Sequence, residues 1–241
     1  MIEELLKKRR NISFFKQDKI PDLQLIKEIL EKAKDLTPHK NNFWHYEIDV
    51  YGPEHSAQKK KLAMSTVCGK HKNDHNRWSN MTPEMARELE TRYDDWLAYH
   101  YGDKTKQYIK DDSWHFNNQV TAPYLLAYYP ATQKMRESQK RGKYWDTGKL
   151  QQTFDKVEKI HKDQFNQQAG MNAMVTTMLA VEKGLDVSFC KCYFYEPAIH
   201  NDITLKSGLA FVMGMGYGDY DRFNHKSWVA KPTLDEVIKW R

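Results

Sequence analysis

The sequence predicts an α+β protein that forms a single domain. Stretches in which apolar residues recur at helical spacing alternate with short apolar stretches that are typical of strands. The 241 residues are enough for one large domain with a sizeable buried core. With 40% hydrophobic and 13% aromatic residues, the composition excludes a disordered chain. Because no repeat, low-complexity tract or linker divides the sequence, we expect one domain over residues 1–241.

The first 52 residues predict two helices and a strand. Residues 1–10 carry apolar side chains on one side and cations on the other, as an amphipathic helix does. Residues 18–36 predict a second helix, with Pro21 at its first position and an end at Thr37–Pro38. Residues 44–52 alternate apolar and polar side chains, which indicates a strand.

Residues 58–112 differ in composition and predict a helical insertion, which we interpret as a lid over a binding site. They are rich in Lys, His, Trp and Asp, and Pro83 opens a helix within them. His71 and His75 are four residues apart, but no H-E-x-x-H motif occurs, and therefore we expect no metal site. Aromatic side chains of the insertion could stack on an aromatic substrate. These are Trp78, Tyr93, Trp96, Tyr99 and Trp114.

The second half predicts two buried strands and a long central helix. Residues 122–131 and 209–218 are almost continuous apolar runs, as in strands covered on both faces. Residues 165–186 predict a helix that Gly184 closes. Apolar residues cover more than one side of this helix, so we expect it to be buried in the core or against another subunit. Residues 233–240 predict a closing helix.

Composition leaves the partner of the chain open but favours a soluble protein. The formal charge is +6 and the pI about 9.0, yet cations are mixed with 32 acidic residues, so a small anionic ligand explains the excess as well as nucleic acid does. Cys68, Cys190 and Cys192 are odd in number, which implies no disulfide framework and fits a reducing, cytoplasmic setting. No apolar run approaches the roughly 18 residues that span a bilayer, so we expect no membrane association.

The stretch KKRRNISFF, residues 7–15, indicates a site that holds an anion. Four cations are followed at once by a polar segment and by Phe14 and Phe15. A hydrophobic helix precedes the cations, so they belong to a folded segment, which argues against a tail for nucleic acid. Two interpretations remain: the cations bind one ligand, or they form a solvated helix end that its own dipole favours.

Four segments in register resemble the FMN-dependent nitroreductase family. They are the arginine segment with NISFF, AKDLTPHKNNFWHYEIDV, QQAGMNAMVTTMLAVEKGLDVSF, and FVMGMGYGD with Lys226–Ser227 downstream. The resemblance covers nearly the whole chain except residues 58–112. It implies a nitroreductase-like sandwich, in which helices wrap a central, mainly antiparallel sheet, and a homodimer. It also implies FMN as cofactor, NAD(P)H as electron donor, and a small electron-poor acceptor such as a nitroaromatic or a quinone.

The same resemblance implies the flavin contacts but no catalytic side chain. In the family, the arginine segment and a cation near the carboxyl terminus bind the phosphate. Lys226 is the expected cation in this chain, and Arg222 and Lys231 are the other candidates. The loop at residues 38–42 reaches the flavin of the partner subunit, and the turn after the central helix offers backbone N–H groups to the ring. The carried-over residues are Arg9, Arg10, Asn11, Ser13, Pro38, His39, Lys40, Asn42 (or Asn41), Asn118, Phe189, Cys190, Lys191, Lys226 and Ser227.

Departures from the family pattern leave two further hypotheses open. Asn11 stands where the family has Ser, Phe43 where it has Pro, and Lys191–Cys192 where it has Glu-Gly or Gly-Gly. A flavin-binding protein with little or no turnover would share the remaining motifs. A basic nucleic-acid-binding module is the other alternative, and it would purify without colour.

Overall fold

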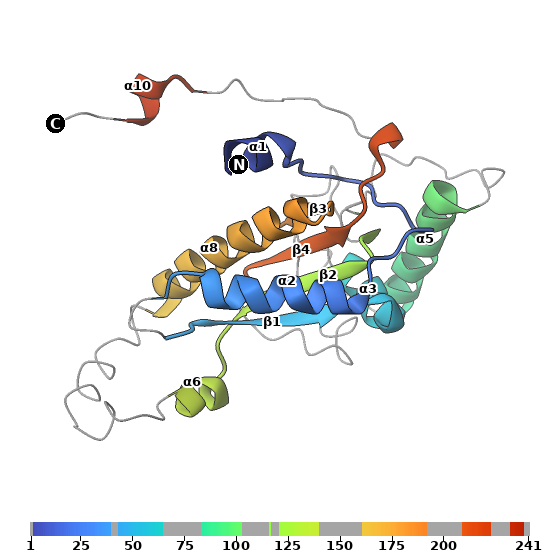
Figure 1. Cartoon of the computed structure of the whole chain (residues 1–241). Coiled ribbons are helices and arrows are strands. Elements are labelled where there is room, and N and C mark those ends of the chain that lie inside the picture. Colours follow the sequence, from blue (N-terminus) through green and yellow to red (C-terminus); the bar gives the residue numbers. More distant parts are fainter. Residues whose placement is uncertain are drawn as a thin grey trace.

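Four antiparallel strands form the centre of the computed structural model (Figure 1). It describes residues 2–39, 43–64, 83–102, 116, 121–139, 161–191, 209–222 and 232–238. The strands are β1 (Tyr46–Tyr51), β2 (Tyr124–Pro130), β3 (Asp186–Cys190) and β4 (Phe211–Gly216), in the order β1-β2-β4-β3. The helices are α1 (Ile2–Lys8), α2 (Leu23–Leu36), α3 (Ser56–Met64), α5 (Pro83–Tyr101), α6 (Gln133–Gln139), α8 (His161–Glu182) and α10 (Leu234–Val237). This architecture confirms the expected α+β sandwich.

Most of the predicted elements are present, with shifted ends. Asp22 caps α2 through a hydrogen bond from the backbone N of Gln24, so Pro21 precedes the cap and does not occupy the first helical turn. Gly184, at φ 76°, follows α8 as predicted, because a residue without Cβ adopts this left-handed conformation without strain. The predicted closing helix contains only four helical residues, since Ile238 is already extended.

The sequence did not predict strand β3 or helix α6. Residues 186–190 form β3, so Phe189 and Cys190 lie in a strand and only Lys191 follows it, which corrects the expected turn. The short helix α6 follows β2 and is held by Thr132, whose backbone N and hydroxyl both donate to Glu47 on β1.

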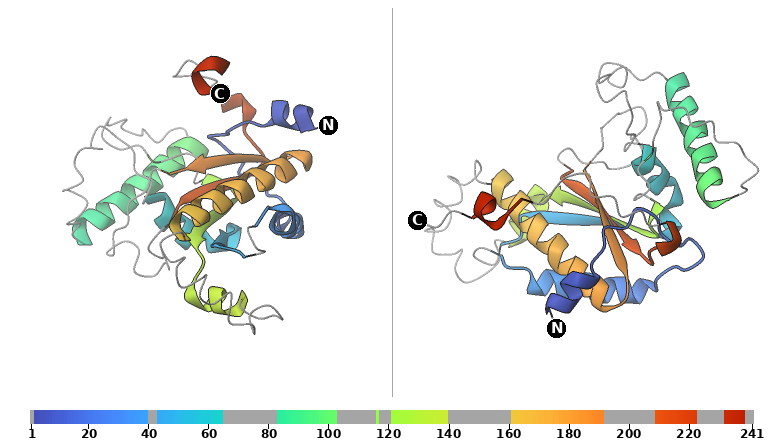
Figure 2. Two further views of the ribbon diagram at one scale, coloured as in Figure 1. Left: turned by 90° about the vertical axis from the view of Figure 1, so that its left-hand side faces the viewer. Right: turned by 90° about the horizontal axis from the view of Figure 1, so that it is seen from above.

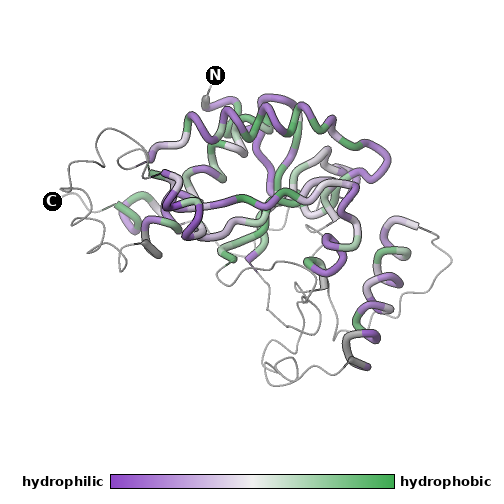
Figure 3. The backbone as a smooth tube through the Cα atoms, turned by 90° about the horizontal axis from the view of Figure 1, so that it is seen from below, coloured by the Kyte–Doolittle hydropathy of each residue, from purple (hydrophilic) through white to green (hydrophobic). Residues whose placement is uncertain are grey.

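The sheet separates two apolar cores. On one face, α2 and α8 cover Tyr124, Leu126, Tyr128, Met213 and Met215 of the central strands. On the other face, α3 and α5 cover the alternate residues of the same strands. Figure 2 shows α2 and α5 on opposite sides of the strands, and Figure 3 shows hydrophobic residues concentrated where the elements meet.

The described parts of the 58–112 insertion are helical, as predicted. Pro83 begins α5, and α5 packs on α3 beside the sheet. Tyr93 and Trp96, however, are only 6% and 2% exposed. They face the sheet with Phe116 and cannot stack on a substrate, which corrects the prediction for these two residues. Tyr99 is exposed, while Trp78 and Trp114 lie outside the described residues.

Candidate functional site

The extended segment after α1 lies alongside the end of β3. The backbone N of Ile12 donates to the carbonyl of Val187 at 3.1 Å, and Asn11 forms a parallel bridge with Val187. The Asn11 side-chain oxygen accepts the backbone N–H of Phe189 at 3.1 Å. Two segments that are 178 residues apart in sequence, both predicted to contact a flavin, are therefore in direct contact.

The two arginines of this segment differ in their surroundings. Arg10 Nη1 donates to the backbone carbonyls of Lys7 and Arg9, at the carboxyl end of α1. A cation at this place is favoured by the helix dipole. Arg10 also lines a pocket of about 260 Å³ together with Tyr220 and Asp186. Arg9 is exposed, so its guanidinium faces solvent beside the same segment.

The remaining predicted groups near β3 fall into an exposed set and a buried one. Ser13 and Lys191, each two residues along the chain from the contact between Asn11 and Phe189, are both exposed. Phe189 is half-buried and packs its ring against Phe211 on β4. Cys190 is 3% exposed, so its thiol lies within the protein.

The predicted loop contains a half-buried histidine, His39. His39 Nε2 lies 3.4 Å from the Tyr46 hydroxyl, and its ring centroid is 4.5 Å from that of Trp44. Burial lowers the pKa of His39, although a hydrogen bond to the backbone of Thr37 opposes this shift. Burial raises the pKa of Tyr46 to about 12, so its hydroxyl stays protonated. Both side chains are therefore neutral near pH 7.

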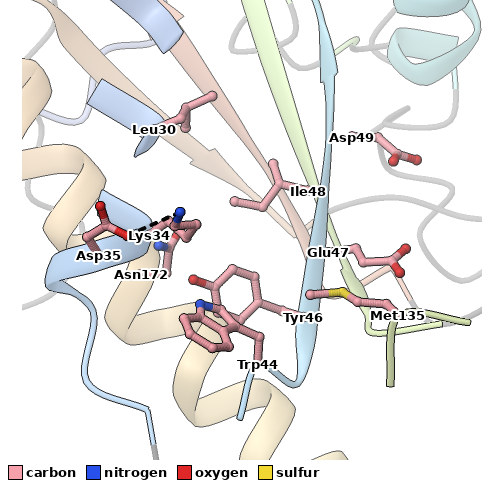
Figure 4. A pocket seen from close by; sticks show the side chains of 10 residues that line it. All are labelled: Leu30, Lys34, Asp35, Trp44, Tyr46, Glu47, Ile48, Asp49, Met135 and Asn172. Carbon is pink, nitrogen blue, oxygen red and sulfur yellow. Dashed lines mark ion pairs between the residues drawn. The ribbon is translucent and has the colours of Figure 1, made fainter. Parts of the chain in front are cut away.

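A groove runs along the outer edge of β1, next to this loop (Figure 4). Its volume is about 600 Å³. Trp44, Tyr46 and Ile48 project from one side of β1 toward α2 and α8, whereas Glu47 and Asp49 project from the other. The groove thus combines apolar walls with a charged rim. Its lining residues are Leu30, Lys34, Asp35, Trp44, Tyr46, Glu47, Ile48, Asp49, Met135 and Asn172.

Arg222, one of the three cations considered for the phosphate, is held by the helical insertion. Its guanidinium donates to the backbone carbonyl of His100 at 2.9 Å and lies 2.8 Å from His100 Nδ1. The guanidinium carbon is 3.9 Å from the centre of the Phe14 ring and 4.9 Å from that of Tyr101. Arg222 therefore connects α5 to the segment that carries Asn11 and Ser13.

Several predicted site residues lie outside the described residues. They are Lys40, Asn41, Asn42, Asn118, Lys226, Ser227 and Lys231. Among the described residues, the predicted contacts form two groups: one beside β3, from residues 9–13 and 189–191, and one at Pro38–His39. No group of three or more potential metal-ligating side chains gathers in the described part of the chain.

The sequence prediction missed the polar side chains that hold these segments in place. Gln168 and Asn172 are buried on α8, and Asp186 is buried on β3. Asp186 accepts the backbone N–H of Gly218 and the hydroxyl of Tyr220. Polar residues that interrupt an apolar pattern were the available signal, since a buried polar group needs a partner.

Comparison with solved structures identifies the fold. The chain aligns over 100% of its length with 100% of a nitroreductase family protein from Streptococcus pneumoniae TIGR4, with TM-score 0.63 and 14% identity. The FMN and NADPH-dependent nitroreductase NfnB from Sphigopyxis sp. strain HMH gives TM-score 0.55 and 18% identity, with 100% of this chain and 99% of that chain covered. A protein described as a nitroreductase from Exiguobacterium sibiricum 255-15, solved in complex with FMN, gives TM-score 0.61, 13% identity, and coverage of 100% and 97%.

The chain therefore has the nitroreductase fold, over its whole length. It matches no protein-family model and no curated protein sequence. The fold that the four sequence motifs predicted is thus confirmed by structural likeness. Among the described helices, none has both the length and the apolar character needed to cross a membrane.

Proposed function

We propose that this protein binds FMN and is a flavin-dependent oxidoreductase. It would transfer hydride from NAD(P)H, through the flavin, to an electron-poor small molecule such as a nitroaromatic or a quinone. The contact between Asn11 and Phe189 carries the proposal, because it joins two segments that the sequence motifs assign to flavin binding. The fold supports it, since similar structures include a protein in complex with FMN and an FMN and NADPH-dependent nitroreductase.

The groups around this contact fit FMN in their chemistry. A phosphate needs cations and hydroxyl or N–H donors, and Arg9 and Ser13 offer such groups on exposed side chains. A flavin ring needs donors at its polar edge, and the backbone N–H of Lys191, the exposed residue that follows β3, could supply one, since the N–H of Phe189 already donates to Asn11. Lys191 would place a positive charge near the ring. Arg10 would act mainly by holding the end of α1.

Bound FMN would supply the hydride chemistry, and the protein would contribute position and electrostatics. The backbone of Asn11 and Phe189 is fixed by hydrogen bonds, so the polar groups beside it are positioned before a ligand arrives. The half-buried, neutral His39 would contribute hydrogen bonds without net charge. No described side chain needs to act as a general acid or base in this proposal.

We also propose that the active form is a homodimer. One side of α8 is buried against the sheet and α2, whereas Met171 and Met174 on it are 39% and 40% exposed. Two large apolar side chains one turn apart on such a helix favour contact with a second subunit. A loop at residues 38–42 that completes the neighbouring site would need this arrangement.

Titration of the flavin-free, full-length protein with FMN tests the proposal. We expect saturable binding, release of FMN on denaturation, and stabilisation by about 2.7 kcal/mol when FMN is at 100 times Kd. If saturating FMN neither binds nor raises the melting temperature, the proposal is wrong. Oxidation of NAD(P)H with a quinone or nitroaromatic acceptor then separates an enzyme from a flavin-binding protein without turnover.

A further inference from the structure

Two buried amide side chains on α8 contact both ends of the loop at residues 38–42. Gln168 and Asn172 are four residues apart and thus lie on the same side of the helix. They are 3% and 1% exposed. Gln168 contacts the chain that leaves the loop, and Asn172 contacts Thr37, which precedes it.

Gln168 binds the chain after the loop as a neighbouring strand would. Its Oε1 accepts the backbone N–H of His45 at 2.9 Å, and its Nε2 donates to the carbonyl of Phe43 at 3.0 Å. The carbonyl of Phe43 and the N–H of His45 are two residues apart on one segment, and a neighbouring parallel strand would bind the same two groups. Phe43 and His45 are themselves only 4% exposed. This contact therefore fixes the backbone just where the loop ends.

Asn172 binds the residue at which α2 ends. Its Nδ2 donates to the Thr37 hydroxyl at 2.9 Å, and its Oδ1 accepts the Tyr128 hydroxyl at 3.0 Å. The Thr37 hydroxyl in turn donates to the carbonyl of Ala33, and the Thr37 backbone N donates to the same oxygen. Asn172 of α8 and Lys34 of α2 line the same groove (Figure 4). Through these hydrogen bonds, Thr37 is joined both to its own helix and to α8.

The two amides contribute specificity for one backbone position as well as packing energy. A buried amide without hydrogen bonds is unfavourable, so each side chain is compatible only with a backbone that supplies its partners. An apolar residue at either position would pack as well and would impose no such condition. Hydrogen bonds are directional, and therefore the two amides specify where the loop begins and ends.

We propose that Gln168 and Asn172 are positioning residues: they hold the chain at Thr37 and at Phe43–His45, the described positions on either side of residues 40–42, and this placement favours flavin binding. The expected effect on flavin binding rests on the proposed FMN function. The positioning of the chain by the two amides can be tested without FMN. α8 also carries the exposed Met171 and Met174, so the same helix would link the proposed subunit contact to the loop.

The test compares two variants with one matched control. Thr37→Val removes the hydroxyl that Asn172 contacts, and Gln168→Leu removes the amide that contacts Phe43 and His45. Thr177→Val is the control, because this fully buried hydroxyl donates only within α8, to Ala173 at 2.7 Å. Each is measured twice: by the rate of tryptic cleavage after Lys40 in the flavin-free protein, and by the Kd for FMN.

Both variants should be cleaved after Lys40 at least about tenfold faster, and should bind FMN at least about tenfold more weakly, because each removes two buried hydrogen bonds. Thr177→Val should change either quantity by less than about twofold. If cleavage in the folded variants equals that of the parent, the amides do not position the loop. If cleavage rises while FMN affinity stays the same, the link to flavin binding is wrong.

The measurements distinguish a failure of the proposed FMN function from a failure of the proposed positioning role. If the parent protein itself binds no FMN, the proposed function fails, while the cleavage rates still decide whether the amides hold the loop. If Gln168→Leu does not fold, Thr37→Val alone decides, since it exchanges side chains of nearly equal size. Circular dichroism of every variant establishes that the compared proteins are folded.

Discussion

The two faces of the central sheet are covered by different kinds of interaction. On the side of α2 and α8, the apolar core contains a hydrogen-bonded chain that runs from Tyr128 through Asn172 to Thr37. On the side of α3 and α5, the core around Trp96 and Phe116 is formed by aromatic packing. At the rim of this core, Arg222 makes polar contacts with His100.

This difference separates two requirements of a binding site. Aromatic packing is strong but nearly non-directional, so it can hold a helix on the sheet without specifying the path of a loop. Buried hydrogen bonds add less net energy, but they accept only one geometry. The α8 side is therefore suited to fixing residues 37–45, and the α5 side to holding an insertion in place.

The largest expected effect is on the aromatic side. Trp96→Ala should lower the free energy of unfolding by about 3–5 kcal/mol, because it removes a large side chain that is 2% exposed and leaves a cavity. Denaturant unfolding measures the change. Tyr99→Ala, on the exposed side of the same helix, is the control and should cost less than about 1 kcal/mol. An equal loss in both variants would mean that α5 is not held by the Trp96 cluster.

Helix α5 shows which features could be predicted from the sequence and which could not. Pro83 and the recurring apolar residues correctly predicted α5, because helix formation depends on local pattern. The pattern did not reveal that Trp96 faces the sheet, since a helix alone does not indicate what lies against its apolar side. β3 escaped prediction because its five residues, DVSFC, alternate too weakly and follow a helix directly.

The candidate site was predictable to a similar degree. The motifs placed Asn11 and Phe189 in one site, and the structure brings these two residues into contact. They could not indicate that Arg10 would bind the last carbonyls of α1, because this depends on the direction of one side chain. Gln168 and Asn172 were overlooked, since α8 carries several polar residues and the sequence does not indicate which of them are buried. Their partners on other elements are more than 40 residues away.

A smaller effect is expected on the hydrogen-bonded side. Tyr128→Phe should lower the free energy of unfolding by about 1 kcal/mol, because it removes the donor to Asn172 while keeping the ring in the core. A double-mutant cycle with Asn172→Ala, measured by denaturant unfolding, should give a coupling energy of at least about 0.5 kcal/mol. Strict additivity would show that the two side chains do not stabilise each other, and the comparison of the two faces would lose its basis.

The smallest expected effect is the pH dependence of the rim contact on the aromatic side. Burial, and secondly the charge of Arg222, lower the pKa of His100 from 6.5 to about 4. Tyr101 and Asp219 also lie in this environment. Between these two pKa values the unfolded chain binds more protons than the folded one, so the stability due to neutral His100 is present above pH 6.5 and decreases as the pH falls toward 4.

The size of this decrease is limited because His100 is only half-buried. After allowance for solvent screening, we expect a loss on the order of 0.5–1 kcal/mol between pH 7.5 and pH 5. His39, whose pKa is also lowered by burial, contributes in the same direction, so the measurement must be a difference. His100→Gln, unfolded in denaturant at both pH values beside the parent, should lose less stability on acidification. If the two proteins lose the same amount, burial and the charge of Arg222 do not hold His100 neutral in the folded protein.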